Sequence, residues 1–175
     1  VLEQACQQLT MWHQESPSEP RLTISVNVSK RQVAERTLVD DIRRIMASTG
    51  VDGQCLRFEI TESVIMANVD LIADVLNEIK AMGIQIHMDD FGTGYASLSC
   101  LHRYPIDVVK LDREFVNTMN GKDGYSGVVQ SVINLTHNLN MEVIVEGVET
   151  AQQLTELKDL GSDYAQGYYF SKPLD

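Results

Sequence analysis

The sequence has little positive charge. Of its 175 residues, 14 are Lys or Arg and 25 are Asp or Glu, so the formal net charge is −11. No cluster of Lys and Arg interrupts this acidic excess, which argues against a surface that follows the phosphates of DNA or RNA. If a substrate carries phosphate, we expect metal ions to supply the positive charge that the protein lacks.

Cysteine and long apolar runs are also scarce. Cys6, Cys55 and Cys100 are odd in number, far apart, and include no Cys-x-x-Cys pair. This pattern argues against a disulfide framework or a zinc ribbon and suits a reducing cytoplasm, where we expect the protein to act. No apolar run approaches the ~20 residues of a membrane span, so we expect no signal peptide and no membrane contact by this segment.

Two nucleotide-binding motifs are absent as well. No predicted strand is followed by Gly-x-Gly-x-x-Gly or by a P-loop lysine, which excludes the dinucleotide-binding and P-loop NTPase classes. The chain instead alternates helices and strands, which is typical of a parallel α/β architecture. Strands are predicted near residues 22, 56, 84, 106, 141 and 163, and helices over 1–14, 29–49, 65–79, 126–138 and 151–160.

Several predicted strands alternate strictly between apolar and polar residues. In one of them, Leu56, Phe58 and Ile60 share a face and the polar residues share the other. Strands in an open parallel sheet usually read as continuous apolar runs, so this polar phase predicts a barrel with a polar lumen. An open sheet with one wet face is the alternative. A (βα)8 barrel needs about 250 residues, so we expect an α/β, TIM-type barrel that is N-terminally incomplete, with about six strands visible and roughly two units upstream of Val1.

The most informative stretch runs from Ile84 to Leu98, IQIHMDDFGTGYASL. It alternates like a strand and ends in the adjacent carboxylates of Asp89 and Asp90, followed by a glycine-spaced loop. Because adjacent carboxylates repel each other, we expect a cation, most simply a metal, beside them. The alternative is a surface turn with two solvated acids. His87 shares the phase of Asp89 but lies deeper, so we expect a hydrogen-bonded histidine that fills the lumen.

Functional residues of such barrels lie at the C-terminal ends of the strands. The polar residues at the predicted ends are Asn27, Glu59, Asp89, Asp90, Lys110, Asp112, Glu146 and Gln166. All potential ligands among them are oxygen donors, which suit Mg²⁺ or Mn²⁺ better than zinc. Two such ions can bridge a phosphodiester and activate water, with Asp89 or Asp90 as the bridging ligand. Lys110 fits a fixed charge near the attacking water, unless it neutralises Asp112 or Asp107.

Six segments, in this order, resemble the EAL-domain family of bacterial cyclic-di-GMP phosphodiesterases. They are SVNVSKRQ (25–32), FEITES (58–63), DDFGTGYASL (89–98), PIDVVKLDREFV (105–116), EVIVEGVET (142–150) and AQGYYFSKPL (165–174). The family fold is a TIM-type barrel with one strand reversed. The resemblance implies hydrolysis of cyclic di-GMP to linear pGpG with two Mg²⁺ or Mn²⁺. It also implies a homodimer and allows sensor or GGDEF domains upstream.

The resemblance also assigns roles to residues of this sequence. The first metal would be held by Asn27, Glu59 and Asp89, and the second by Asp90, with Asp89 shared. Lys110 would hold the hydrolytic water, and Glu146 would act on the second metal or as the catalytic base. Asp112, Glu149 and Gln166 would line the pocket. Glu62 would anchor the 89–98 loop and help couple a dimer interface to metal binding. From the residues alone, Glu62 and Glu149 are equally well explained as acids at helix N-termini.

One family feature is missing. The Glu-Ala-Leu signature, whose glutamate is a metal ligand and whose neighbouring arginine contacts substrate, would lie upstream of Val1. We therefore expect residues 1–175 to form an EAL-type barrel domain without the N-terminal strand that carries the signature, and this chain alone to be impaired. The alternative function is a degenerate module that binds cyclic di-GMP as a receptor. All the downstream acids are present, which favours the enzyme.

Overall fold

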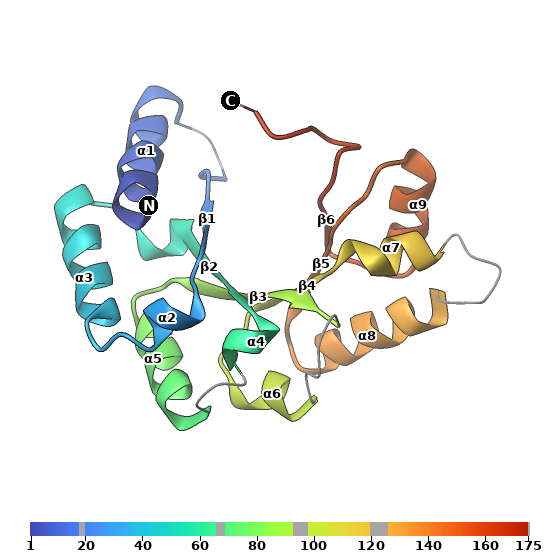
Figure 1. The fold of residues 1–175 in the computed structure, drawn as a ribbon. Coiled ribbons are helices and arrows are strands. Elements are labelled where there is room, and N and C mark those ends of the chain that lie inside the picture. Colours follow the sequence, from blue (N-terminus) through green and yellow to red (C-terminus); the bar gives the residue numbers. More distant parts are fainter. Residues whose placement is uncertain (18–19, 66–68, 93–97, 120–125, 175) are drawn as a thin grey trace.

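The computed structural model describes residues 1–17, 20–65, 69–92, 98–119 and 126–174, which form alternating helices and strands (Figure 1). The strands are β1 (Ile24–Asn27), β2 (Leu56–Thr61), β3 (Gln85–Phe91), β4 (Val108–Leu111), β5 (Glu142–Val145) and β6 (Tyr164–Ala165). The helices are α1 (Leu2–Glu15), α2 (Lys30–Val33), α3 (Leu38–Thr49), α4 (Glu62–Ile65), α5 (Val69–Ala81), α6 (Leu98–Arg103), α7 (Arg113–Met119), α8 (Ser126–Asn138) and α9 (Ala151–Asp159). A 3₁₀ turn, η1 (Gly53–Cys55), precedes β2.

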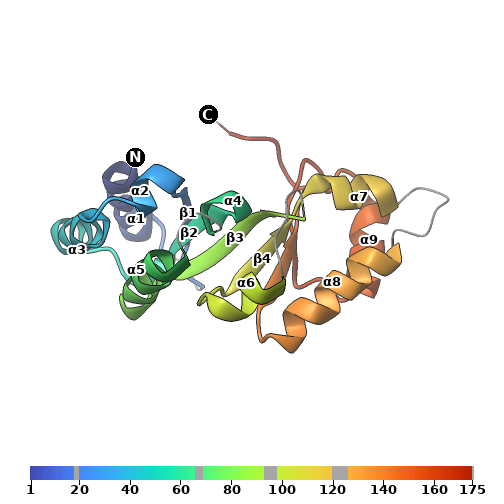
Figure 2. The same ribbon diagram turned by 60° about the horizontal axis from the view of Figure 1, so that its bottom comes forward.

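The six strands form one parallel sheet in the order β1-β2-β3-β4-β5-β6. Because spatial order follows chain order, the sheet winds in one direction, unlike a doubly wound sheet, whose strand order reverses at a switch point. Figures 1 and 2 show the sheet curled into a U with α3, α5, α6, α8 and α9 along its outer side. The described strands therefore form a half-barrel, which confirms the prediction of a truncated TIM-type barrel.

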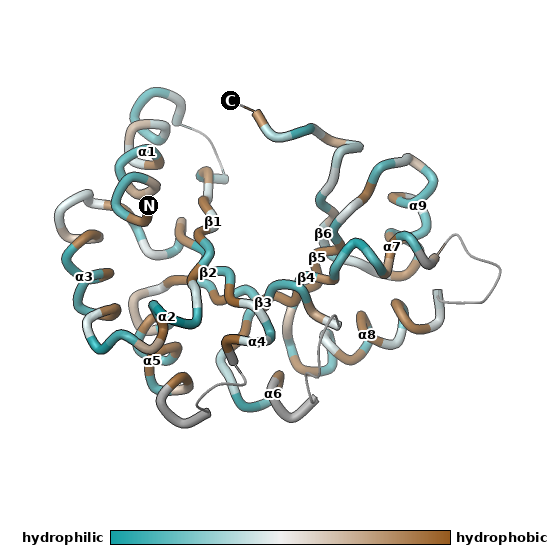
Figure 3. The backbone as a smooth tube through the Cα atoms, in the orientation of Figure 1, coloured by the Kyte–Doolittle hydropathy of each residue, from teal (hydrophilic) through white to brown (hydrophobic). Residues whose placement is uncertain are grey.

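The two faces of the strands differ as the sequence predicts. Leu56, Phe58 and Ile60 point outward and are almost fully buried, as are Ile86 and Met88 on the next strand. Figure 3 shows hydrophobic and hydrophilic stretches alternating along the helices, as expected of helices that pack one side on a sheet. The alternating polar residues of the strands lie on the opposite, inner face of the sheet, where the candidate site is located.

One predicted helix is wrong in extent. The capping box at Ser29 and Gln32 is present, but the helix predicted to run to Thr49 is divided into α2 and α3. The buried residues Val33 and Val39 are six positions apart, a spacing that cannot lie on one helical face. The helix predicted from the apolar stripe between residues 65 and 79 matches the end of α4 and most of α5, and residues 66–68 between them lie outside the described ranges.

Two smaller features also differ from the sequence pattern. The pattern does not predict helix α7. Met11 and Val128 have the helical spacing of inward-facing apolar residues but are about half exposed. Cys6 and Cys55 are both free and buried. Within the described ranges, no helix is long and apolar enough to cross a membrane.

An aspartate at the N-terminal end of β4 helps to fix how β3, β4 and β5 align. Asp107, directly before β4, accepts a hydrogen bond from the Ile86 N–H of β3 at 2.8 Å. Its other carboxylate oxygen pairs with Lys80 of α5, and its backbone carbonyl accepts a hydrogen bond from the Glu142 N–H at the start of β5. One residue therefore joins three strands and the helix before them.

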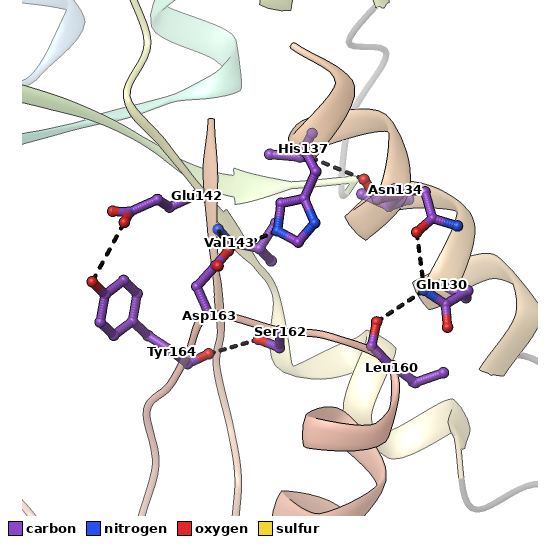
Figure 4. Close-up of polar contacts among 11 residues, drawn as sticks. Gln130, Asn134, His137, Glu142, Val143, Leu160, Ser162, Asp163 and Tyr164 are labelled. Atoms are coloured by element: carbon purple, nitrogen blue, oxygen red, sulfur yellow. Dashed lines mark hydrogen bonds and ion pairs between the residues drawn. The ribbon is translucent and has the colours of Figure 1, made fainter. Parts of the chain in front are cut away.

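The same device recurs at the start of β6 (Figure 4). Asp163 Oδ2 accepts a hydrogen bond from the Val143 N–H at 2.8 Å and lies 2.8 Å from His137 Nε2 of α8. In both cases the basic side chain lies six residues before the strand residue that donates to the aspartate. The same arrangement thus aligns α5, β3 and β4 through Asp107, and α8, β5 and β6 through Asp163.

Candidate functional site

Strand β3 contains an extra residue where the two adjacent aspartates lie. Met88 pairs with Val109 and Phe91 with Leu111, so three steps along β3 match two steps along β4. Asp90 has a φ of 55°, a left-handed conformation that Asp tolerates better than most residues. This geometry is that of a β-bulge. As a result, Asp89 and Asp90 on β3 both lie opposite a single residue of β4, Lys110.

From the sequence, this strand is predicted to end at Asp90, whereas β3 in fact continues through the bulge to Phe91. Regular alternation would turn Asp90 toward the outer helices and Phe91 into the lumen. With the extra residue, Phe91 returns to the outer face, where it is buried. The spacing of three between the apolar residues Met88 and Phe91 was the sequence signal that could have predicted it.

Lys110 lies at the centre of the candidate site. Its Nζ is 3.2 Å from Glu59 Oε1, 2.9 Å from Asp89 Oδ1 and 2.8 Å from Glu146 Oε1. These side chains come from β2, β3, β4 and the residue after β5, and the lysine side chain is only 5% exposed. The alternative in which Lys110 neutralises Asp112 or Asp107 is thus not supported, because Lys110 pairs elsewhere and Asp107 pairs with Lys80.

The excess of negative charge shifts the titration of the site. Burial raises the pKa of Glu146; Lys110 opposes this, while Asp89 and Glu59 add to it. Burial also raises the pKa of Asp90, and the charges of Asp89 and Asp112 act in the same direction. For Lys110, burial favours the neutral amine, but hydrogen bonds to Glu146 and Asp89 outweigh it and raise the pKa above its usual value. The site therefore holds its lysine charged and favours further positive charge.

A pocket of about 230 Å³ lies beside this cluster. It is lined by Asp112, Arg113, Glu146, Gly147, Glu149, Gln166, Gly167 and Tyr168. The structure thus brings together the residues predicted to line a pocket, Asp112, Glu149 and Gln166, with Glu146. Asp112 also accepts a hydrogen bond from the Glu114 N–H at the start of α7. Glu149 is not the N-cap of α9, because Thr150 caps that helix.

The sequence can now be compared with known proteins. The EAL domain model matches residues 1–173. The chain belongs to the EAL domain family. A relative from Pseudomonas aeruginosa, the cyclic di-GMP phosphodiesterase NbdA, is 35% identical over 174 residues, which cover 99% of this chain and 22% of NbdA. The cyclic di-GMP phosphodiesterase PdeR of Escherichia coli is 36% identical over 87% of this chain and 23% of PdeR.

Solved EAL structures agree with the fold. The PaMucR phosphodiesterase in complex with c-di-GMP superposes with a TM-score of 0.91 at 35% identity, covering 99% of this chain and 69% of that one. The EAL domain of Mycobacterium smegmatis DcpA gives a TM-score of 0.91 at 32% identity, over 99% and 77% of the two chains. The present chain spans about a fifth of the length of the curated relatives it matches.

The donor set of this EAL domain fits a hard divalent ion. Glu59, Asp89, Asp90 and Glu146 offer carboxylate oxygens, and Asn27, which pairs with Glu59 in the ladder, offers an amide oxygen. Asp89 Oδ1 is buried and lies 2.9 Å from Lys110 Nζ, at an angle that leaves it available to a further cation. In the described ranges no three His, Cys, Asp or Glu side chains are already arranged around a metal position. The carboxylates instead converge on the lysine ammonium.

Two buried residues of the EAL domain, His87 and Glu62, have polar atoms without a hydrogen-bond partner among the described residues. His87 is buried as predicted, at 1% exposed, but the predicted hydrogen bond is wrong, because neither ring nitrogen has a partner among the described residues. Burial and the charge of Arg57 lower its pKa to about 4, which keeps it neutral. Glu62 is buried at the start of α4, and its Oε2 lacks a partner among the described residues. Most of the loop it is predicted to anchor, residues 93–97, lies outside those residues.

Proposed function

We propose that this chain belongs to a metal-dependent phosphodiesterase that hydrolyses cyclic di-GMP to linear pGpG. The names of NbdA and PdeR support the reaction class, and the c-di-GMP complex of PaMucR supports the ligand. The observation that carries the proposal is the convergence of Glu59, Asp89 and Glu146 on Lys110 within 3.2 Å. An ammonium surrounded by strand-end carboxylates suits in-line attack on a phosphodiester.

We assign the oxygen donors to two ions, Mg²⁺ or Mn²⁺. Asn27, Glu59 and Asp89 would hold the first, and Asp90 the second, with Asp89 shared between them. When bound, the ions would supply the positive charge that activates water and stabilises the leaving oxygen. The bulge supports the sharing, because it gives two consecutive carboxylates access to one ladder position.

The chain's own residues would orient the water and accept its proton. The three N–H bonds of Lys110 now face Glu59, Asp89 and Glu146; once Glu59 or Asp89 turns to a bound ion, Lys110 Nζ can donate the freed hydrogen bond to the attacking water. Glu146 takes the water proton as the new P–O bond forms, and the bond from phosphorus to the 3′ oxygen breaks to open the ring. The raised pKa of Glu146 suits this role, since a general base works best when its pKa approaches the working pH. Asp112, Glu149 and Gln166 would line the pocket for the substrate.

The direct test is incubation of the intact protein with cyclic di-GMP and Mg²⁺ or Mn²⁺, followed by chromatographic detection of pGpG. EDTA should abolish the product. Glu146→Gln should lower kcat by about 10²–10⁴-fold while nucleotide binding remains measurable. Glu15→Gln, an equally isosteric change at the exposed end of α1, is the matched control. Near-normal turnover by Glu146→Gln would refute the assignment of the base, and wild-type binding without turnover would favour the receptor.

We further propose a homodimer, with sensor or GGDEF domains as partners in the whole protein. The name of the relative MucR, a bifunctional diguanylate cyclase/cyclic di-GMP phosphodiesterase, supports the second expectation. Light scattering on the intact protein should give twice the monomer mass. A monomer at all concentrations and in the presence of substrate would contradict the dimer.

A further inference from the structure

His87 is a buried polar side chain that the proposed hydrolysis does not use. It lies in β3 and is 1% exposed, and neither of its ring nitrogens has a hydrogen-bond partner among the described residues. A buried polar group without a partner lowers stability, because it gives up its hydrogen bonds to water on folding. An apolar side chain of similar size would avoid this cost. Positions that break the rules of packing in this way are expected where function requires them.

The ladder partners of His87 show which group its ring can reach. On β4 the residue opposite is Val108, whose side chain is apolar. On β2 the residue opposite is Glu59, and because neighbouring strands lie about 4.8 Å apart, the two side chains stand side by side. Asp89 is two residues along β3, or about 6.6 Å away. Glu59 is therefore the polar side chain directly opposite His87.

Glu59 is engaged elsewhere in the present structure. Its Oε1 lies 3.2 Å from Lys110 Nζ, and it forms no hydrogen bond with His87. Lys110 lies closer to its other two partners, at 2.9 Å and 2.8 Å, so its contact with Glu59 is the longest of the three. In the two-metal assignment, Glu59 turns from Lys110 to an ion. A carboxylate that gives one oxygen to an ion has its second oxygen free to accept a hydrogen bond.

We propose that His87 is a positioning residue, which donates a hydrogen bond to Glu59 when Glu59 serves as a metal ligand. Hydrogen bonds of this kind orient the carboxylate ligands of metal sites. Burial and the charges of Arg57 and Lys110 lower the pKa of His87 to about 4, so at neutral pH the ring has one N–H to donate and no charge that would repel the ion. This inference rests on the proposed function, since it takes Glu59 as a metal ligand.

The test measures the Kd for Mg²⁺ of the intact protein by calorimetry and its Tm in EDTA. His87→Leu should weaken Mg²⁺ binding about 10- to 100-fold and leave the Tm in EDTA at or above that of the wild type, because two unpaired buried nitrogens are removed. A purely structural histidine would give the reverse, a lower Tm and an unchanged Kd. His87→Asn and His87→Gln place an amide N–H near the positions of Nδ1 and Nε2, and one of them should restore most of the affinity.

Two control variants separate this role from general effects of mutation. His102→Leu makes the same change at an exposed position of α6, and Met88→Leu alters the buried neighbour of His87 on β3. Neither should change the Kd for Mg²⁺. In NMR spectra of the wild type, the imidazole N–H proton of His87, assigned by its loss in His87→Leu, should shift downfield when Mg²⁺ is added, as expected for a new hydrogen bond to a carboxylate.

The outcomes distinguish this role from the proposed function. Wild-type affinity for Mg²⁺ in His87→Leu overturns the positioning role, and so does the failure of both amide variants to restore affinity. If the wild type binds Mg²⁺ but forms no pGpG, the proposed function fails, and the comparison of Kd values still decides the role of His87. If the wild type binds neither Mg²⁺ nor Mn²⁺, both proposals fail.

Discussion

Replacing Lys110 with methionine would remove the one positive charge at the centre of the candidate site. Methionine keeps most of the length of the side chain, so the change mainly concerns charge. The variant leaves Glu59, Asp89 and Glu146 facing one another without the ammonium that now lies within 3.2 Å of each. Without metal, we expect a substantial loss of stability at neutral pH.

The magnitude follows from distance and burial. Two oxygens within about 3 Å of the same nitrogen cannot be more than about 6 Å apart, where unit charges repel by about 3 kcal/mol at an effective dielectric constant of ~20. Removing one partner of a buried ion pair typically costs about 3–5 kcal/mol. The three carboxylate side chains retain 11–22% exposure, so we expect the lower end, about 3 kcal/mol. For a chain of this size, that corresponds to a decrease in Tm of roughly 6–12 °C.

The loss should depend on pH. In the variant, repulsion from Asp89 and Glu59 is no longer opposed by Lys110 and raises the folded-state pKa of Glu146 further above its unfolded value of about 4, so the protonated form of Glu146 favours the folded state. That contribution is present at low pH and lost as pH rises through the folded-state pKa. In the wild type, Glu146 already has a raised pKa, and the raised pKa of Lys110 keeps the ammonium's contribution up to alkaline pH. The stability difference between variant and wild type should therefore be small near pH 4 and largest near pH 7.

A divalent ion should reverse the loss. An ion at 100 times its Kd stabilises a folded protein by about 2.7 kcal/mol, and the variant lacks the ammonium that competes for these carboxylates. Thermal unfolding with EDTA and with Mg²⁺ measures both effects, and Lys158→Met on α9, an exposed lysine, is the control. An unchanged Tm for Lys110→Met in EDTA at pH 7 would refute the charge argument, and an equal Mg²⁺ response in both proteins would refute the competition.

Three further predictions concern the bulge, the turn after β5 and the register. Asp90→Asn should lower turnover at least about tenfold even at high Mg²⁺, and an unchanged rate would contradict the two-metal assignment. Gly147→Ala should cost more free energy of unfolding in urea than Gly161→Ala. Both residues have positive φ, so the left-handed backbone costs alanine about 1–2 kcal/mol at either position. Only a Cβ at residue 147 also collides with Arg113. Equal losses of stability in the two variants would refute the packing argument. Asp107→Ala should destabilise by about 1–3 kcal/mol and speed hydrogen exchange of the Ile86 amide, whereas Asp107→Asn, which keeps an acceptor for that amide, should slow it back toward wild type.

The barrel could be predicted because its signal is local. A period of two in Leu56–Thr61 encodes which side chains face the helices and which face the lumen, and the same parity predicts that Glu59 and Asp89 lie on one face. Where the parity itself changes, at Asp90, the assumption of a regular strand failed. The capping box at Ser29 likewise predicts where a helix begins but contains no information on where it ends.

Contacts between distant segments were harder to predict. The sequence placed His87 in the lumen but could not show that neither of its ring nitrogens would find a partner among the described residues. The sequence places Lys110 at a strand end but does not predict its ion pairs. Lys110 pairs with Glu59 and Glu146, whereas Asp107 pairs with Lys80. Arg113 and Tyr168 lie outside the strands, and their meeting at one pocket depends on how α7 and the residues after β6 pack.

The bulge in β3 also bears on how such a site can change during evolution. Deleting residue 90 would give a regular ladder in which Phe91 still pairs with Leu111 and every outward residue keeps its neighbour. The pairing of β3 with β4 therefore does not require residue 90. A loss or gain of a single codon would remove or restore the second carboxylate while leaving the packing of the half-barrel in place. Under the two-metal assignment proposed above, a change of this one residue would separate a hydrolase from a non-hydrolysing binder built on this scaffold.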